Sequence, residues 1–375
     1  MSRRARQRHS GPYEAAVVPS IGNVAAPAIP SELSAEVADA SQAIARFDAE
    51  KGAALGTYSS LLLRSESAAS SQIENLTASA RNIALAEIGR ADKQNASLIV
   101  ANTRAMNAAL ALADELTSEA IVATHAVLLT ETQPDIVGAW RQDQVWVGGE
   151  AYGPHQAMFV PPHHEFVGPA MEDLIVFLHR NDMPVLTHAA ISHAHFETIH
   201  PFPDGNGRTG RTLVHALLRA KGLTQKVTVP ISGGLLANVD RYFDALTAYR
   251  EGDVSPIVQM FVDAAFHAIN NATILIDELE EVRRGWEETV TARSDSAVWS
   301  TMEVLLARPI VDSALLSEKL GVATKNALRA IDRLESAGVV REMSGKGRNR
   351  LWEASAVLAA LDGFAARAGR RQQPA

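Results

Sequence analysis

The residue types that could do chemistry gather in one short segment, His200-Pro-Phe-Pro-Asp-Gly-Asn-Gly-Arg-Thr-Gly-Arg211. Gly205 and Gly207 allow a tight turn whose backbone N–H groups point inward, and the unpaired amides of a following helix would join them. Arg208 and Arg211, three residues apart on the first turn of that helix, add charged donors suited to phosphate oxygens. The segment therefore predicts an anion pocket that binds a phosphate group.

Two further side chains of this segment point to a reaction at the phosphate. Asp204 is a hard oxygen ligand that could hold Mg²⁺ against the bound phosphates. His200 stands at the edge of the turn as a proton acceptor. In-line attack at phosphorus needs a base on one side and charge neutralisation on the other, so the residue types fit transfer of a phosphate-containing group.

Two other readings of the segment are weaker. The spacing Gly205-x-Gly207-x-x-Gly210 matches the dinucleotide pattern, but that pattern requires a preceding strand and an acid about 20 residues further on. Here a helical pattern precedes it, and residues 212–238 hold no Asp or Glu. A zinc site built from His193, His195 and His200 is the second alternative, although HExxH spacing and cysteine ligands are missing.

The segment resembles the HxFx[D/E]GNGRxxR signature of the Fic (Fido) family, and every specified position is matched. The family's usual reaction is transfer of AMP from ATP to a protein hydroxyl, with release of pyrophosphate. The resemblance implies that His200 deprotonates the target hydroxyl, that Asp204 holds Mg²⁺ and that Arg211 binds the terminal phosphate region. It further implies a core position for Phe202 and a phosphate cradle formed by Gly205, Asn206, Gly207 and Arg208.

A second element upstream, Ser70-Ser-Gln-Ile-Glu74-Asn75, resembles the inhibitory motif [S/T]xxxE[G/N] of Fic proteins. In family members the glutamate pairs with the second arginine of the signature, here Arg211, and blocks placement of the ATP γ-phosphate. The resemblance thus implies that Glu74, with Ser70 and Asn75, inhibits the activity of the enzyme. The alternative is an ordinary capping box, Ser71-x-x-Glu74, at a helix start.

Between these elements, residues 145–147, Gly148-Gly149 and residues 158–160 predict a short hairpin or extended flap. It resembles the flap that aligns an extended target segment by strand addition in the Fic family. An ordinary surface hairpin is the alternative.

The chain that must position these residues is expected to be mainly α-helical, because apolar residues recur at three and four spacings over most of its length. We expect a Fic-type helical bundle with a small β-hairpin flap, followed by a winged helix-turn-helix domain. The predicted organisation is a flexible or strap-like arm (1–32), an N-terminal helical region with the inhibitory motif (33–115), a Fic core (116–280), a linker helix (281–297), and the winged helix with its tail (298–375).

The C-terminal unit is predicted to form three helices, near 300–306, 313–320 and 324–337, followed by a hairpin. This order is typical of a winged helix. Basic side chains mark two places where phosphate contacts are expected: Lys325, Arg329 and Arg333 on the third helix, and Lys346, Arg348 and Arg350 on the wing. Asp332 and Glu335 share that helix, so binding of a protein or a second copy is left open beside DNA binding.

The amino-acid composition excludes some classes of protein and indicates a cellular compartment. The 375 residues carry 35 Lys and Arg against 43 Asp and Glu, a net charge of −8, which excludes a generally basic nucleic-acid coat. No cysteine is present, so disulfides and thiolate chemistry are excluded, and the chain suits a reducing cytoplasm. The basic N-terminus is followed by prolines rather than a signal-peptide core, and no stretch is apolar enough for a membrane span.

The function expected from the sequence is therefore Mg²⁺-dependent protein adenylylation, with ATP as substrate and a Tyr, Thr or Ser hydroxyl of a target protein, or of the chain itself, as acceptor. Removal of AMP on the same fold is one alternative, with Glu74 positioning a water. A DNA-binding regulator whose Fic core senses nucleotide is another. Formation of a homodimer is left open.

Overall fold

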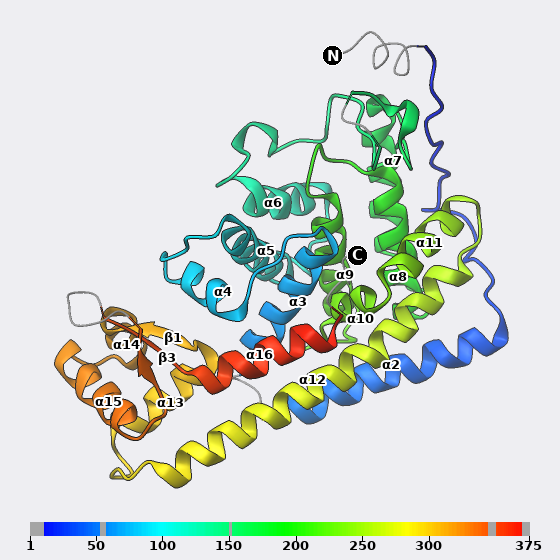
Figure 1. Cartoon of the computed structure of the whole chain (residues 1–375). Coiled ribbons are helices and arrows are strands. Elements are labelled where there is room, and N and C mark those ends of the chain that lie inside the picture. Colours follow the sequence, from blue (N-terminus) through cyan, green and yellow to red (C-terminus); the bar gives the residue numbers. More distant parts are fainter. Residues whose placement is uncertain (1–10, 53–57, 150–151, 344–349, 370–375) are drawn as a thin grey trace, which may run out of the picture. The chain divides into compact units, whose positions relative to one another are not determined.

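The computed structural model describes residues 11–52, 58–149, 152–343 and 350–369, and it is mainly α-helical (Figure 1). The chain divides into two compact units. Unit 1 takes the described residues up to Gln42 together with Arg104–Leu223 and Val239–Asp263. Unit 2 takes Ala43–Thr103, Thr224–Asn238 and the chain from Ala264 onward. Three helices, α2 (Ser31–Gly52), α5 (Gln94–Ala111) and α12 (Ser255–Thr289), contribute residues to both.

Unit 1 is built around α8 (Val185–Ile199), whose residues from Leu186 to Ile199 are all buried. A helix buried on every side needs neighbours on every side. α8 packs against α7 (Val167–Leu178), α9 (Asn206–Ala220) and α11 (Val239–Arg250), while α6 (Ser118–Leu129) packs on α9. Single turns of 3₁₀ helix at Pro134–Ile136, Pro154–Gln156 and His164–Phe166 lie in the connection between α6 and α7.

The close approach of α8 and α9 depends on Gly210. A Cβ at this position would lie 2.9 Å from a ring carbon of Phe196 and 3.0 Å from a carboxylate oxygen of Glu197. Distances this short cannot be relieved without moving buried side chains. The last glycine of the 200–211 segment therefore serves helix packing.

Residues 11–30, which precede α2, form neither helix nor strand and belong to unit 1, where α7 holds part of them; residues 1–10 of the predicted arm lie outside the described residues. The Asp173 carboxylate on α7 accepts hydrogen bonds from the Ser20 hydroxyl and from the backbone N–H groups of Ile21 (2.6 Å) and Gly22 (3.0 Å). Arg180 donates to the carbonyl oxygens of Ile21 and Val24. These bonds fix the second half of the segment.

The flap differs in detail from the predicted hairpin. Among the described residues of this connection, the two stretches meet in one antiparallel bridge between Val147 and Phe159 and form no longer ladder. Gly148 and Gly149 take positive φ angles of 72° and 77°, and the chain then enters the 3₁₀ turn at Pro154–Gln156. A proline-started turn inside the connection cannot extend the ladder, because proline has no N–H to donate.

In unit 2, the C-terminal helix α16 (Ser355–Arg367) packs on α3 (Ser59–Ile73) and α4 (Ala80–Glu87), and α10 (Ile231–Ala237) packs on α3. The amide of Gln72 on α3 donates to the carbonyl oxygen of Gly369 at 3.2 Å. The Asp362 carboxylate on α16 accepts from the backbone N–H of Ala80 at 2.9 Å. The C-terminal helix is therefore part of the same packed body as α3 and α4.

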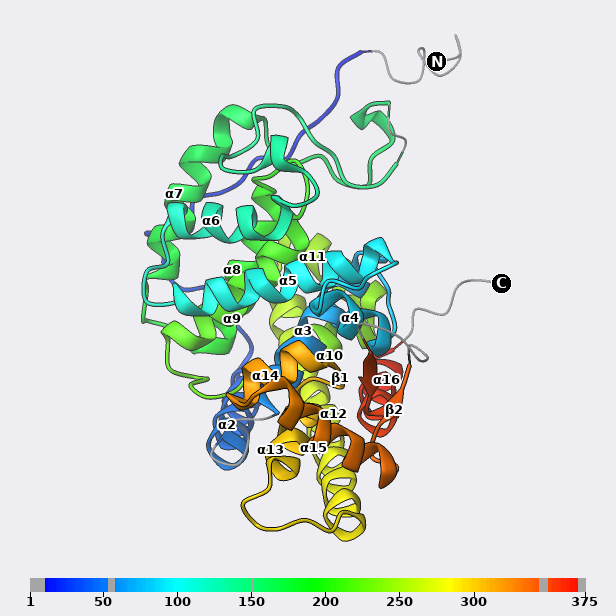
Figure 2. The same cartoon turned by 90° about the vertical axis from the view of Figure 1, so that its left-hand side faces the viewer.

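The winged helix is confirmed as three helices and a small sheet, α13 (Ala297–Ala307), α14 (Ser313–Leu320), α15 (Thr324–Ser336) and strands β1 (Ile310–Asp312), β2 (Arg341–Glu342) and β3 (Leu351–Glu353) (Figure 2). The strands are antiparallel in the order β1-β3-β2, and the fully buried Trp352 lies opposite Val311 and Glu342. Strand β1 and helix α16 were not expected. The predicted wing residues Lys346 and Arg348 lie outside the described residues.

Across the described ranges, no helix combines the length and the apolar character needed to cross a bilayer.

Candidate active site

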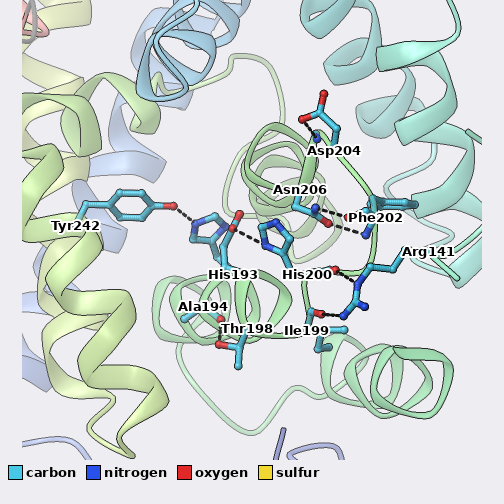
Figure 3. Close-up of polar contacts among 12 residues, drawn as sticks. Arg141, His193, Ala194, Thr198, Ile199, His200, Phe202, Asp204, Asn206 and Tyr242 are labelled. Atoms are coloured by element: carbon cyan, nitrogen blue, oxygen red, sulfur yellow. Dashed lines mark hydrogen bonds and ion pairs between the residues drawn. The ribbon is translucent and has the colours of Figure 1, made fainter. Parts of the chain in front are cut away.

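The predicted site lies in the loop that joins α8 to α9, and His200 is the first residue of this loop. His200 ends α8 with φ 51° and ψ 61°, the left-handed region that residues with a side chain rarely adopt. Its Nδ1 lies 3.9 Å from a carboxylate oxygen of Glu197, one turn earlier on α8. Strained backbone of this kind persists only where surrounding contacts hold it, and Figure 3 shows those contacts.

Arg141 supplies the holding contacts. Its guanidinium donates to the carbonyl oxygen of His200 at 2.8 Å (Figure 3). It also donates to the carbonyl oxygens of Asp143 (3.0 Å) and Pro162 (2.5 Å). The Arg141 backbone N–H donates to the carbonyl oxygen of Pro201 at 2.9 Å. Burial lowers the pKa of this side chain to about 10, so it stays charged at neutral pH. The Arg141 side chain therefore connects the residues that flank the flap with the backbone of His200.

The loop is closed internally by Asn206. Its side-chain oxygen accepts from the Phe202 backbone N–H and its amide nitrogen donates to the Phe202 carbonyl oxygen, both at 2.8 Å. The buried Phe202 ring stacks on His125 at 3.7 Å and lies 5.0 Å from Trp140. The Asn206 side chain is thus used within the loop, and its predicted contribution to phosphate binding rests on its backbone N–H.

The anion pocket expected from the glycines has the backbone geometry it needs. Gly205 caps α9 at its N-terminus with φ 79°, and helix residues begin at Asn206. The first N–H groups of a helix lack carbonyl partners within the helix, and they favour bound anions. A Cβ at Gly205 would lie 3.2 Å from side-chain carbons of Leu128 and Leu129, so both conformation and space favour glycine.

Arg208 and Arg211 lie on the first turns of α9, and their side chains are almost fully buried. Nη2 of Arg208 lies 3.7 Å from a carboxylate oxygen of Asp204. Arg211 lies close enough to His193 for its charge to help lower the pKa of that imidazole. Two buried guanidinium groups beside a helix N-terminus make this end of α9 strongly attractive to anions.

Asp204 stands at the mouth of the loop, with its side chain about half exposed. One carboxylate oxygen accepts from the Gly205 backbone N–H at 2.7 Å, and the other accepts from the Gln133 amide at 2.6 Å. Mg²⁺ in phosphate-binding sites takes one or two carboxylates and completes its shell with phosphate oxygens and water. An exposed carboxylate beside an anion pocket fits that requirement.

The zinc alternative finds no support in the geometry. His193 Nε2 lies 2.7 Å from the Tyr242 hydroxyl, and His195 Nδ1 lies 2.9 Å from the Tyr249 hydroxyl. Burial lowers the pKa of His193 to about 3 and that of His195 to about 4. No group of three metal-ligating side chains occurs in the part of the chain that the structure describes. The dinucleotide alternative also fails, because helix α8 rather than a strand precedes the glycines.

Comparison with known proteins agrees with this geometry. Residues 115–218 match the model of the Fic/DOC family, and residues 300–354 match the model of an HTH DNA binding domain. The chain contains a Fic domain. It is 32% identical to the protein adenylyltransferase Fic of Drosophila ananassae and 31% identical to that of Drosophila virilis, each over 161 residues, or 42% of this chain. It spans only 29% and 30% of the lengths of these two relatives.

A solved structure shows the same fold over most of the chain. The crystal structure of a Fic family protein from Desulfovibrio desulfuricans superposes with a TM-score of 0.58 at 21% identity, covering 88% of this chain and 97% of that one. At this identity the match shows the fold alone.

Within the Fic domain the structure brings His200, Asp204, Gly205, Asn206, Gly207, Arg208 and Arg211 together, since they are consecutive in one loop and the first turns of one helix. Sequence reasoning missed three residues that support them: Arg141, His125 and Gln133. His125 Nε2 lies 3.0 Å from the Asp204 carbonyl oxygen, which can only accept, so the ring donates from this nitrogen. No local pattern marks these three positions.

The predicted inhibitory residues lie at the C-terminal end of α3 in unit 2. Ser70 is buried within the helix, Glu74 is the residue at which the helix ends, and Asn75 takes a left-handed φ of 62°. The Leu76 N–H then donates to the Ser71 carbonyl oxygen at 3.0 Å, closing the helix end. The motif's preference for Gly or Asn after the glutamate follows from this conformation, which those residues adopt most readily.

The capping-box alternative is wrong for this segment. Ser71 lies inside α3, where its hydroxyl donates to the Ser67 carbonyl oxygen at 2.8 Å and accepts from the Asn102 amide at 3.2 Å. The residue that caps the next helix is Ser79, whose side chain accepts from the Asn82 N–H. The inhibitory role of Glu74 stays a prediction.

Proposed function

We propose that this chain is a Mg²⁺-dependent protein adenylyltransferase that transfers AMP from ATP to a side-chain hydroxyl of a target protein or of itself. The observation that carries the proposal is the placement of His200 at one end of a loop whose other end is the N-terminus of α9 with Arg208 and Arg211. A proton acceptor and an anion pocket on the same rigid loop are what attack at a phosphorus requires. The adenylyltransferase relatives support it over the matched region.

In the proposed reaction His200 accepts the proton of the target hydroxyl as its oxygen bonds to the α-phosphorus. The bond from that phosphorus to the bridging oxygen breaks, and pyrophosphate leaves with the electron pair. The N-terminal amides of α9 and the two arginines bind the phosphates and stabilise the developing charge. Asp204 is the residue that would hold Mg²⁺, which neutralises charge on the phosphate oxygens.

Glu74 is proposed to restrain the enzyme through its carboxylate. The match of Ser70, Glu74 and Asn75 to the inhibitory motif supports this, as does the helix end that presents Glu74 with an exposed side chain. A carboxylate that pairs with an arginine of the phosphate site would remove a positive charge that ATP needs. The cytoplasmic setting and a homodimer belong to the same proposal.

Two alternatives remain. Removal of AMP would use the same residues, with Glu74 positioning a water. A DNA-binding regulator is favoured by one specific observation, the HTH DNA binding match over residues 300–354. That reading predicts salt-dependent DNA binding that does not change in the His200→Ala variant.

The deciding experiment is incorporation of label from α-labelled ATP with Mg²⁺ into wild type, Glu74→Gly, and Glu74→Gly with His200→Ala. If Glu74→Gly takes up more label than wild type and the added His200→Ala substitution abolishes it, the result supports both the AMP transfer and its inhibition by Glu74. The matched control is Glu74→Gly with His179→Ala, which removes an exposed histidine at the end of α7 and should keep the label. Absence of label in every folded variant would contradict the proposal.

A further inference from the structure

The imidazole of His200 has a buried carboxylate beside it. Glu197 lies one turn earlier on α8, and an oxygen of its carboxylate is 3.9 Å from His200 Nδ1. This distance is too long for a hydrogen bond, but it is short enough for an ion pair once the ring takes up a proton. Nδ1 is buried, whereas the His200 side chain as a whole is 18% exposed. Nε2 is therefore the ring nitrogen that is left to accept a proton from a substrate.

The Glu197 carboxylate fills a space that Gly210 leaves on α9. A Cβ at Gly210 would lie 3.0 Å from Glu197 Oε1, so a larger residue there would displace this oxygen. The Glu197 side chain is only 9% exposed. An ionised carboxylate that is buried to this degree requires a compensating cation or hydrogen-bond donors. The charged groups around Glu197 therefore decide what its carboxylate can do for His200.

Arg250 is a cation that acts on this carboxylate from a second helix. It is the last residue of α11, and α11 packs on α8. Burial lowers the pKa of Arg250, and the negative charge of Glu197 opposes this effect. The Arg250 Cζ also lies 3.6 Å from the centre of the Phe159 ring, on the flap residue that bridges Val147. Arg250 thus connects the charge of Glu197 with the flap.

The other titratable and charged groups near His200 come from every element around it. They are His193 on α8, Arg208 and Arg211 on α9, Tyr242 on α11, His125 on α6 and Arg141 in the connection that follows α6. Burial lowers the pKa of His193 to about 3 and also lowers that of His125. All of these groups stay the same when Glu197 alone is replaced, so a change in the titration of His200 reports on the Glu197 charge.

We propose that Glu197 is a positioning residue for His200: its carboxylate holds the ring with Nε2 available to the acceptor hydroxyl and stabilises the imidazolium that forms, while Arg250 places this carboxylate and connects it with Phe159. The proposal deepens the proposed adenylyltransferase function and rests on it. It assigns a role in proton transfer to a residue outside the 200–211 segment.

The proton transfer balances as follows. The O–H bond of the acceptor hydroxyl breaks as its oxygen bonds to the α-phosphorus, and the proton passes to Nε2 of His200. Nδ1 keeps its own proton toward Glu197, so the ring becomes an imidazolium beside a carboxylate. The imidazolium returns one proton to water after pyrophosphate has left. Because the carboxylate lowers the free energy of the charged ring, it acts on the step in which that charge develops.

The first test needs no activity. His200 is titrated by NMR in the full-length chain labelled with ¹³C at histidine Cε1, and its signal is identified by its loss in His200→Gln. Glu197→Gln keeps the size of the side chain but removes its charge. The imidazolium loses its counter-ion, so the midpoint of the His200 titration should fall by about one pH unit. Glu197→Asp keeps the charge and should give a midpoint closer to that of wild type.

The matched control is Glu172→Gln, an exposed carboxylate on α7, and it should leave the midpoint unchanged. Equal midpoints for wild type and a folded Glu197→Gln chain would overturn the proposal. Arg250→Gln should move the midpoint in the opposite direction, upward, because it removes a cation that acts on Glu197. Arg241→Gln, at a half-exposed position on the same helix, is its control. An unchanged or lower midpoint in Arg250→Gln would refute the part assigned to Arg250.

The second test measures the initial rate of transfer of labelled AMP in the Glu74→Gly chain between about pH 5 and pH 8. The pH of half-maximal rate should fall by the same amount in Glu197→Gln, and the maximal rate should fall at least tenfold. A merely structural role would lower the rate without moving this pH. A chain that labels itself with an unshifted profile in Glu197→Gln refutes the role of Glu197 alone. Absence of label in every folded variant refutes the proposed function, and this role with it.

Discussion

The guanidinium of Arg141 lies 2.8 Å from the carbonyl oxygen of His200, a residue 59 positions further along the chain. His200 needs this contact because its left-handed backbone is unfavourable for a residue with a side chain. The same guanidinium reaches the flap at Asp143 and Pro162. One buried side chain therefore contacts both the backbone of His200 and the residues that flank the flap.

Arg141→Lys tests this coupling. Lysine keeps the charge but loses the planar fork that serves several carbonyl oxygens at once, so the free energy of unfolding should fall by about 2–3 kcal/mol. Transfer of labelled AMP in the Glu74→Gly background should fall at least tenfold. Urea unfolding and the labelling assay measure the two effects. Arg241→Lys, at a half-exposed pair with Asp263, should change stability by less than about 1 kcal/mol.

Asn206→Asp tests the internal closure of the loop. The carboxylate can still accept from the Phe202 N–H, but it cannot donate to the Phe202 carbonyl oxygen, and it places a negative charge beside the phosphate pocket. We expect a loss of about 1–3 kcal/mol in the free energy of unfolding and a clear drop in ATP affinity measured by calorimetry. Asn95→Asp, which replaces an exposed amide that donates to the Thr77 carbonyl oxygen, is the control. Unchanged ATP affinity in Asn206→Asp would contradict the assignment.

The part of the site that lies in one continuous segment of the chain could be predicted from the sequence. The residues that reach this segment from elsewhere in the chain could not. Residues 200–211 lie together because they are neighbours in the chain, so their types and spacing alone indicate an anion pocket. Arg141, His125 and Gln133 reach the loop only through the packing of α6 and the connection that follows it. A single arginine or histidine in such a stretch has no periodicity that distinguishes it from a surface residue.

The fold shows the same division. Long amphipathic helices follow from spacing, and the helix 313–320 was predicted with its observed bounds. Strand β1 has only three residues and is stabilised by its pairing with β3, so the local sequence does not predict it. The flap was expected as a hairpin from two apolar runs and two glycines, but a proline-started turn between them limits the pairing to one bridge.

Acid should destabilise the protein through His193. Burial lowers the pKa of this imidazole from 6.5 to about 3, so it stays neutral in the folded state, while the unfolded chain takes up a proton below about 6.5. Because the unfolded state binds more protons in this window, stability falls with decreasing pH by up to about 1.4 kcal/mol per pH unit from this group. His193→Gln should give a shallower slope between pH 6 and 4 in urea unfolding. His179→Gln, at an exposed position, should leave the slope unchanged; equal slopes for both variants would show that His193 is not responsible.

The basic residues of the winged helix fall into two groups that are expected to differ in their availability for phosphate contacts. Lys325 and Arg329 are exposed on α15. Arg350 pairs with Asp332, Glu335 and Glu342 and lies 4.6 Å above the Trp352 ring, so it is bound within the protein. The sequence placed all three among the candidate phosphate contacts, and the structure distinguishes Arg350 from the other two.

If the winged helix binds DNA, Lys325→Gln with Arg329→Gln should lower the slope of log affinity against log salt by about 1.8, because each lost phosphate contact removes about 0.9. Arg350→Gln should leave that slope unchanged and instead lower thermal stability, since it leaves three carboxylates without their cation. Fluorescence anisotropy with a duplex at several salt concentrations measures the slope. A slope that changes in Arg350→Gln and not in the double variant would place the phosphate contacts at the wing, and affinity that does not depend on salt would point to a protein partner for this domain.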